Sequence, residues 1–152
     1  MAAPVPVDDD PIVRALAVLG SRGAFLVMRE AFYGTRRFDD FTRRLGMSPS
    51  ALSARLRELV DDGLLARAPY REAGTRTRSE YVLTPAGEAL LPALVGLQRW
   101  ANDHLPPQGR RVDLVHRGCD APVGATVTCD RGHQLSLADL AVGDEPASRL
   151  TS

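Results

Sequence analysis

The sequence lacks lysine altogether, contains few cysteines and has no long apolar run. All 19 basic residues are arginines, which we attribute to a compositional bias of the genome rather than to selection for guanidinium chemistry. No apolar stretch approaches the roughly 18 residues that a membrane-spanning helix requires. The acidic residues Asp8, Asp9 and Asp10 are the wrong flank for a signal peptide, so we expect a cytoplasmic protein.

Two cysteines, Cys119 and Cys129, cannot form a disulfide framework. In a reducing compartment such residues are by default thiols or metal ligands. The chain of 152 residues is 44% apolar and 25% charged, as is ordinary for a soluble globular protein. This length suffices for one domain with a core and a small appendage.

A net charge of zero argues against a protein that coats nucleic acid without specificity. The charge is unevenly distributed, however. Between Arg22 and Arg78 the sequence has 12 arginines and 7 acidic residues, a surplus of 5 positive charges. A basic surface on this part of the chain is therefore expected.

The clearest local pattern lies between Met47 and Gly63. Ser48 is a strong helix-capping residue, and Pro49 suits the first position of a helix. Apolar residues then recur on one side of the predicted helix, at Leu52, Leu56, Leu59 and Val60. The other side carries small or hydrogen-bonding residues and one cation: Ser50, Ser53, Ala54 and Arg57. Such a face can approach a nucleic-acid groove, although the pattern alone also fits an ordinary surface helix.

Three helices are predicted before this one. The first covers 12–19, and the second runs from Arg22 to a stop at Gly34. Its expected buried residues are Phe25, Leu26, Met28 and Phe32. The third is marked by Phe38, Phe41 and Leu45 and is stopped by Gly46. The short turn between it and Pro49 predicts a helix-turn-helix unit, whose second helix enters the major groove of DNA.

After Gly63 the pattern changes to that of two strands, expected at 64–70 and 79–83. The polar loop between them is basic, with Arg71, Arg76 and, at its end, Arg78. A basic hairpin directly after a helix-turn-helix predicts the wing of a winged helix, with arginines on phosphates or in the minor groove. Any single arginine fits a solvated loop equally well.

Thr84 and Pro85 predict the start of a helix of about 20 residues that ends before Pro106. It has a long apolar face, made of Leu90, Leu91, Leu94, Leu97, Trp100 and Ala101. One winged helix cannot cover this surface, so a second subunit is the expected cover. Trp100 belongs either to the core or to that interface.

Several motifs resemble the HxlR family of bacterial winged-helix transcriptional regulators. They are the Arg-Phe at 37–38, Leu-Ser-Ala-Arg-Leu at 52–56, Asp-Gly-Leu at 62–64 and Tyr-Val-Leu-Thr-Pro-Ala-Gly at 81–87. The resemblance covers about Pro11 to His104. It implies a homodimer, paired through its first and last helices, in which two recognition helices contact a palindromic operator.

The resemblance also assigns roles to residues of this chain. The expected DNA-binding residues are Ser48, Ser50, Ser53, Ala54 and Arg57 on the recognition helix, Arg36, Arg37 and Arg43 on phosphates, and Arg71, Arg76 and Arg78 in the wing. The expected dimer interface contains Leu16, Leu19, Leu94, Leu97 and Trp100.

The sequence departs from the family pattern at two places. Asp10 stands before Pro11 where relatives often have a cysteine that some use as a redox or electrophile sensor, so sensing by that route is not available. Ser21, Arg22 and Gly23 stand where relatives commonly have Gly-Lys-Trp. A pocket there for a small-molecule effector would therefore differ from that of the relatives.

Beyond Pro107 two short strands are expected, 112–120 and 124–136. They carry His116, Cys119, Cys129 and His133, in the pattern H-x2-C-x9-C-x3-H. Thiolate and imidazole pairs at such spacing suit a structural zinc ion. A metal-free hairpin and a regulatory Cys119–Cys129 disulfide are the alternatives, and no cofactor is required by the sequence.

We therefore expect a mainly α protein with a small β-hairpin (α+β). Its parts are a flexible arm (1–11), a winged helix-turn-helix domain for DNA binding and dimerisation (12–106), a β-hairpin extension for which zinc-ribbon-like and metal-free forms are both open (107–140) and a flexible tail (141–152). The expected function is that of a DNA-binding transcriptional regulator, as a repressor, with double-stranded DNA and a second copy as partners. Whether a small-molecule effector also binds is left open by the sequence. The alternative is a winged helix that binds proteins through the extension. No enzyme is expected, because the three histidines lack a paired nucleophile and no phosphate-binding glycine loop is present.

Overall fold

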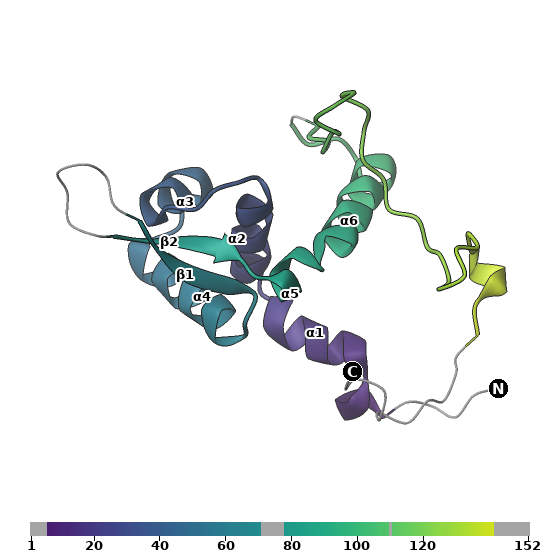
Figure 1. The fold of residues 1–152 in the computed structure, drawn as a ribbon, viewed down its shortest axis with the longest axis horizontal. Helices are drawn as coiled ribbons and strands as arrows, with labels where there is room; N and C mark the ends of the chain where they lie inside the picture. Colours follow the sequence, from purple (N-terminus) through teal and green to yellow (C-terminus); the bar gives the residue numbers. More distant parts are fainter. Residues whose placement is uncertain (1–5, 71–77, 110, 142–152) are drawn as a thin grey trace.

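The computed structural model describes residues 6–70, 78–109 and 111–141 (Figure 1). The elements follow in the order η1 (Val7–Asp9), α1 (Pro11–Leu19), α2 (Arg22–Phe32), α3 (Phe38–Leu45), α4 (Pro49–Asp61), β1 (Leu65–Tyr70), β2 (Arg78–Leu83), α5 (Pro85–Glu88), α6 (Leu91–His104) and η2 (Leu137–Asp139). Helices and one two-stranded antiparallel sheet make up this fold, so the expected fold class is confirmed.

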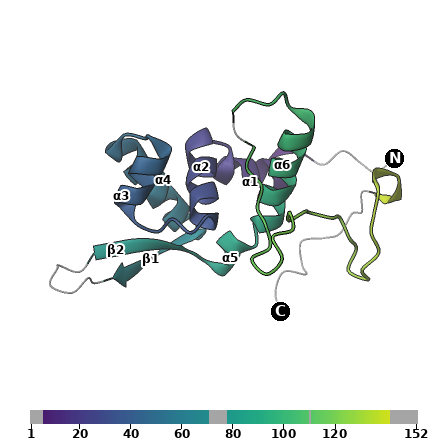
Figure 2. The ribbon, with the colours of Figure 1, turned by 90° about the horizontal axis from the view of Figure 1, so that it is seen from above.

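The core lies where α2, α3 and α4 pack together on one side of the sheet (Figure 2). The rings of Phe41 on α3 and Tyr81 on β2 meet edge to face, with centroids 6.4 Å apart. The buried apolar cluster consists of Ala24, Val27, Met28, Ala31, Phe41, Leu52, Leu56, Leu59, Leu65 and Tyr81. This cluster fixes the position of α4 against the rest of the domain.

The buried side of α2 differs from the prediction. Of the four residues expected inside, only Met28 is fully buried, whereas Phe25, Leu26 and Phe32 are half-buried. The buried apolar residues of this helix are Ala24, Val27, Met28 and Ala31. These follow the helical repeat, and the two alanines let α4 pack closely against α2. The prediction was wrong because it favoured large side chains over the repeat.

The turn between α3 and α4 has the geometry that the sequence predicts. Gly46 adopts a left-handed conformation, with a φ of 63°, and its N–H donates to the carbonyl of Thr42 at 3.0 Å. The Ser48 hydroxyl then accepts a hydrogen bond of 3.3 Å from the N–H of Ala51 at the start of α4. Glycine ends one helix and serine begins the next within three residues.

Strands β1 and β2 form the expected hairpin, with ends shifted by one residue. Their register runs from Leu65 opposite Leu83 to Tyr70 opposite Arg78. The N–H of Tyr81 also donates to the carbonyl of Arg36 at 2.8 Å, which ties the segment before α3 to the sheet. The predicted basic tip, with Arg71 and Arg76, lies outside the described residues.

The long helix expected after Thr84 is divided into α5 and α6. Thr84 caps α5 as predicted, because its hydroxyl accepts from the N–H of Gly87 at 3.0 Å. Pro92 lies in the first turn of α6. Proline has no N–H, and its ring clashes with the carbonyl of the residue four positions earlier, here Glu88, the last residue of α5. This proline explains the division, and the prediction overlooked it.

Helix α1 begins where Asp10 accepts a hydrogen bond of 2.7 Å from the N–H of Ile12. The expected N-terminal arm thus contains the short turn η1 and the cap of α1. None of the helices in the described ranges is by itself long and apolar enough to cross a membrane. Helices α1 and α2 together reach the required length and apolar content, but the pair is bent by 83°. The buried residues of α2 belong to the core of the domain.

The two strands expected beyond Pro107 are absent from the described part of the extension. Instead the chain makes two consecutive turns, each closed by an isolated bridge, Val115 with Pro122 and Thr128 with Gln134. No residue among those described between 111 and 141 is buried. Continuous strands would need a partner sheet or a core that this segment does not supply.

Candidate nucleic-acid interface

The side of α4 that faces away from the core carries the predicted recognition residues. Ser50 and Arg57 are exposed, and Ser53 and Ala54 are half-buried. The hydroxyls of Ser48 and Ser50 lie 3.3 Å apart at the start of the helix. The opposite side holds the buried residues Leu52, Leu56 and Leu59. The helix therefore presents small and hydrogen-bonding side chains to solvent while its leucines hold it in place.

Two arginines on α4 have different surroundings. Arg55 hydrogen-bonds to the hydroxyl of Ser21 at 3.4 Å and pairs with Glu58 at 2.5 Å. In the part of the chain that the structure describes, the guanidinium of Arg57 has no hydrogen bond or ion pair. Arg55 thus links α4 to the start of α2, whereas no described residue occupies the donors of Arg57.

The three arginines expected on phosphates lie around α3. Arg43 pairs with Asp40 on the same helix. Arg36 lies 3.6 Å from the carboxylate of Glu80 on β2, and its side chain is 61% exposed. The guanidinium of Arg37 lies over the ring of Tyr70, 4.6 Å from its centroid. Local partners orient all three cations without burying them.

The start of α3 and the hairpin enclose a hollow of about 430 Å³, lined by Arg37, Phe38, Asp39, Tyr70 and Ser79. The structure therefore brings Arg37, which is expected to contact phosphate, close to Tyr70 and Ser79 at the base of the predicted wing. Arg78 belongs to β2 through its backbone, opposite Tyr70. A further arginine, Arg67 on β1, is exposed, and its guanidinium lies 5.9 Å from the centroid of the Tyr81 ring.

A buried carboxylate behind α3 was not identified from the sequence. Glu30 on α2 is 5% exposed. Its oxygens lie 2.9 Å from Arg29 and 3.6 Å from Arg44, and the hydroxyl of Thr35 donates to it at 3.2 Å. The only sequence signal was an acidic residue within an otherwise apolar helical stripe. Glu30 joins α2 to the last turn of α3, directly before the helix-turn-helix turn.

The residues expected at a dimer interface differ in their exposure. Leu16 on α1 and Leu97 and Trp100 on α6 are exposed, with Trp100 at 52%. Leu19 is half-buried against the core, and Leu94 is buried within the chain. Helices α1 and α6 lie at the same end of the protein, away from α3 (Figure 1). An apolar surface is thus exposed at the end opposite the helix-turn-helix unit.

The four candidate metal ligands form two separate pairs. Nδ1 of His116 lies 3.2 Å from Sγ of Cys119, and Sγ of Cys129 lies 3.5 Å from Nδ1 of His133. Within the described ranges, no three histidine, cysteine or acidic residues are grouped closely enough to hold a metal ion. The structure brings each neighbouring pair together but not all four side chains.

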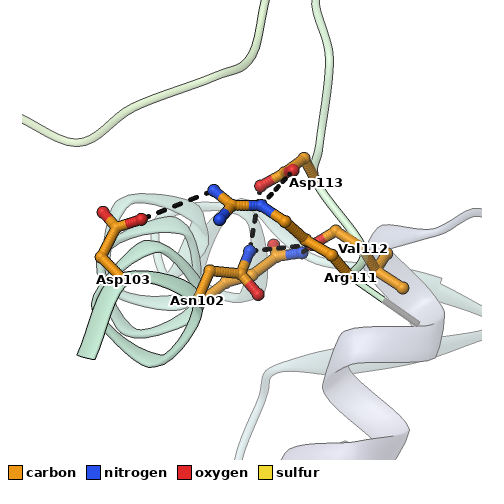
Figure 3. Close-up of polar contacts among 6 residues, drawn as sticks. Asn102, Asp103, Arg111, Val112 and Asp113 are labelled. Atoms are coloured by element: carbon orange, nitrogen blue, oxygen red, sulfur yellow. Dashed lines mark hydrogen bonds and ion pairs between the residues drawn. The ribbon is translucent and has the colours of Figure 1, made fainter. Parts of the chain in front are cut away.

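A polar network attaches the start of the extension to α6 (Figure 3). The side-chain amide of Asn102 donates to the carboxylate of Asp113 at 2.9 Å and to the carbonyl of Val112 at 3.2 Å. Arg111 donates to the same carboxylate at 2.9 Å. This hydrogen bond lowers the pKa of Asp113 and raises that of Arg111.

The same region contains an open cavity of about 590 Å³ between the end of α6 and the following segment. Its lining includes Ala101, Leu105, Pro106, Pro107 and Arg111. Apolar and polar groups are both present on its wall. The cavity lies next to the network that holds the extension, far along the chain from the expected effector position near Gly23.

The tight turn between α3 and α4, the outward face of α4 and the antiparallel hairpin after it define a winged helix-turn-helix protein. Residues 18–109 match the HxlR-like helix-turn-helix family. The chain belongs to this family and is a helix-turn-helix transcriptional regulator. This class is one of DNA-binding proteins rather than of enzymes.

Similar proteins support the same assignment. The chain is 40% identical to the uncharacterised HTH-type transcriptional regulator Rv3095 of Mycobacterium tuberculosis over 123 residues, which are 80% of this chain and 77% of that protein. PA1607, a proposed transcription factor, superposes with a TM-score of 0.77 at 36% identity, over 90% of this chain and 95% of the other. PA1374 of Pseudomonas aeruginosa, also a proposed transcription factor, superposes with a TM-score of 0.63 at 37% identity, over 91% and 94% of the two chains.

Proposed function

We propose that this regulator is a repressor that binds a palindromic operator as a homodimer. The observation that carries the proposal is the guanidinium of Arg57, which has no partner among the described residues and shares the exposed face of α4 with Ser50. Arginine in a bidentate contact with guanine is the commonest specific contact in the major groove. The recognition helix therefore offers both a sequence-reading donor and hydroxyls for phosphates or base edges.

The phosphate contacts are assigned to arginines on both sides of the recognition helix. Arg36, Arg37 and Arg43 are oriented by local partners near α3, and Arg71, Arg76 and Arg78 belong to the predicted wing. Contacts of this kind release counterions, so affinity should fall steeply as the salt concentration rises. This basic region lies in a chain whose net charge is zero, which limits non-specific binding.

The homodimer is supported by the apolar surface at the other end of the domain. Leu16, Leu97 and Trp100 are each more than half exposed on α1 and α6. Burying such surface against the same surface of a second copy gives a two-fold interface. A two-fold pair would present two α4 helices to the half-sites of a palindrome, about one DNA turn, or roughly 34 Å, apart. A regulator of this kind acts where the chromosome lies, in the cytoplasm.

The test uses the full chain and duplexes from the DNA upstream of its own gene and of the neighbouring gene. Fluorescence anisotropy should find one duplex that binds at least tenfold more tightly than random DNA of equal length. Sedimentation should give two chains per duplex, and footprinting should protect an inverted repeat. The complex should also lower transcription from that promoter in vitro.

Equal affinity for all duplexes would contradict the proposal. That result would instead favour the alternative in which the winged helix serves as a protein-binding module. Higher transcription on binding would contradict the repressor assignment alone, since operator binding would remain.

A further inference from the structure

The extension keeps a defined backbone without a hydrophobic core. None of its described residues between 111 and 141 is buried, and Val127 and Leu137 are 59% and 88% exposed. Units shorter than about 40 residues usually need a disulfide, a metal ion or a partner to hold their structure. The polar network at Asn102 and Asp113 secures only the beginning of this segment.

The segment folds as two successive local hairpins. In the first, the N–H of Val123 donates to the carbonyl of Leu114 at 2.8 Å. In the second, the N–H of Leu135 donates to the carbonyl of Val127 at 3.0 Å. Three residues, 124–126, join the two hairpins, so only a short linker separates them in the chain.

Each hairpin carries one histidine and one cysteine at its tip. In the first, His116 and Cys119 flank a turn in which the N–H of Asp120 donates to the carbonyl of His116 at 2.8 Å. In the second, the N–H of Gly132, beside His133, donates to the carbonyl of Cys129 at 2.8 Å. Asp120 and Gly132 both adopt positive φ angles, 55° and 81°, which tighten the two turns.

The ligand atoms within each pair already have the separation that a zinc ion requires. Zinc bonds of about 2.3 Å to sulfur and about 2.0 Å to nitrogen place the two atoms about 3.5 Å apart in a tetrahedron. The two observed separations between Nδ1 and Sγ are 3.2 Å and 3.5 Å. Each hairpin tip therefore holds its histidine and cysteine at a separation that one zinc ion could bridge.

We propose that the extension binds one Zn²⁺ ion per chain through His116, Cys119, Cys129 and His133. The ion joins the two hairpin tips, which the structure holds as separate pairs. Two thiolates balance the charge of the ion, and two neutral imidazoles complete the tetrahedron. The metal ion thus cross-links the two hairpins and stabilises a segment that has no hydrophobic core among its described residues.

The linker between the two hairpins lies close to the regulator domain. Ala125 lies in this linker and faces Gly96 on α6. A Cβ atom built on Gly96 would be 3.7 Å from the Cβ atom of Ala125. The proposal does not depend on DNA binding, because none of the four ligands belongs to the candidate nucleic-acid interface.

The test starts from the full chain purified under reducing conditions without chelator. Elemental analysis should find one zinc per chain. After exchange with Co²⁺, the absorption spectrum should show the visible bands of tetrahedral cobalt and a thiolate-to-cobalt charge-transfer band. The variants Cys119→Ser and Cys129→Ser should each lose at least tenfold in zinc affinity, measured against a chromophoric chelator.

The matched control is His104→Ala, because this third histidine is exposed at the end of α6 and belongs to neither pair. It should bind zinc like the parent chain. Hydrogen exchange of the parent chain gives a second readout that needs no variant. Removing zinc should speed exchange in 111–141 and leave α2 to α4 unchanged.

Zinc far below one equivalent, together with a cobalt spectrum that lacks the tetrahedral bands, would overturn the proposal. Half an equivalent per chain would also overturn it, because that ion would be shared between two copies. So would the finding that Cys119 and Cys129 are oxidised to a disulfide under the reducing conditions of the purification.

Discussion

The buried carboxylate of Glu30 on α2 lies 3.6 Å from the guanidinium of Arg44 in the last turn of α3. Arg29 and Thr35 complete the surroundings of this carboxylate, at 2.9 Å and 3.2 Å. A buried charge is costly unless it is paired and hydrogen-bonded, and Glu30 is both. Because Arg44 is the next-to-last residue of α3, this contact ties α2 to the end of α3 that leads into the turn to α4.

We expect Glu30→Gln to lower the free energy of unfolding by about 1 to 3 kcal/mol, because the amide cannot pair with two guanidinium groups in a buried position. Urea denaturation followed by circular dichroism measures the loss. The control is Glu58→Gln, since Glu58 also pairs with an arginine but its side chain is 51% exposed. The control should change stability by less than about 1 kcal/mol. Equal losses in the two variants would count against the role of Glu30.

The sequence predicted the recognition helix well because its signals are local. Ser48, Pro49 and Gly63 mark the ends of α4, and the leucines fall on one side at helical spacing. The Gly46 turn and the hairpin after Gly63 followed from the same kind of signal. Caps, turns and repeats depend on neighbours in the chain, so they can be recognised without coordinates.

The features that the sequence did not predict depend on tertiary contacts. Arg55 and Arg57 lie two positions apart, yet only the coordinates show that Arg55 is bound to Ser21, the residue that caps α2. One partner of Glu30, Arg44, is 14 positions away on another helix. Two short strands were expected in the extension because its residues suit strands, but no sheet or core is present there to stabilise them.

Arg57→Ala should weaken binding to the operator by about 1 to 3 kcal/mol and relax the base preference at one position of each half-site. The reason is that its guanidinium has no partner among the described residues and faces outward from the recognition helix. Anisotropy titrations against the operator and its single-base variants measure both effects. Arg117→Ala, which removes an exposed arginine of the extension, should leave the affinity unchanged. An equal loss on operator and random DNA would contradict a base contact by Arg57.

Arg76→Ala should weaken binding to operator and random DNA to the same extent, because a wing arginine on a phosphate carries no sequence information. The slope of log affinity against log salt should become shallower by about 1. Titrations at several salt concentrations provide the measurement. An unchanged slope, or a loss confined to the operator, would show that Arg76 does not act through a phosphate.

Leu97→Asp should convert the proposed dimer into monomers, because it places a charge among the exposed apolar side chains of α6, three residues before Trp100. Sedimentation velocity measures the change in mass. Trp100 is the single tryptophan, so its emission should shift to longer wavelength when the parent dimer is diluted and its ring becomes exposed. The control is Leu137→Asp, at a more exposed leucine of the extension. A parent chain that is monomeric at high concentration would be incompatible with this interface.

The attachment of the extension to α6 should weaken in acid. The hydrogen bond from Arg111 holds the pKa of Asp113 below its usual value of about 3.9. When folding lowers the pKa of an acidic group, the ionised group stabilises the folded chain at every pH above the pKa that it has in the unfolded chain. This contribution is lost as the pH falls through the pKa that the group has in the folded chain. The contacts of Asp113 with Asn102 and Arg111 should therefore persist from pH 7 to about pH 5 and be lost below about pH 4.

The NMR signals of the Asn102 side-chain amide, followed across this pH range, report the loss directly. Asp113→Asn should remove the pH dependence, because the amide has no charge to titrate. Asp61→Asn, at an exposed carboxylate on α4, should leave the titration of the Asn102 signals as it is in the parent chain. If the Asn102 signals shift equally with pH in Asp113→Asn and in the parent, a carboxylate other than Asp113 controls this contact.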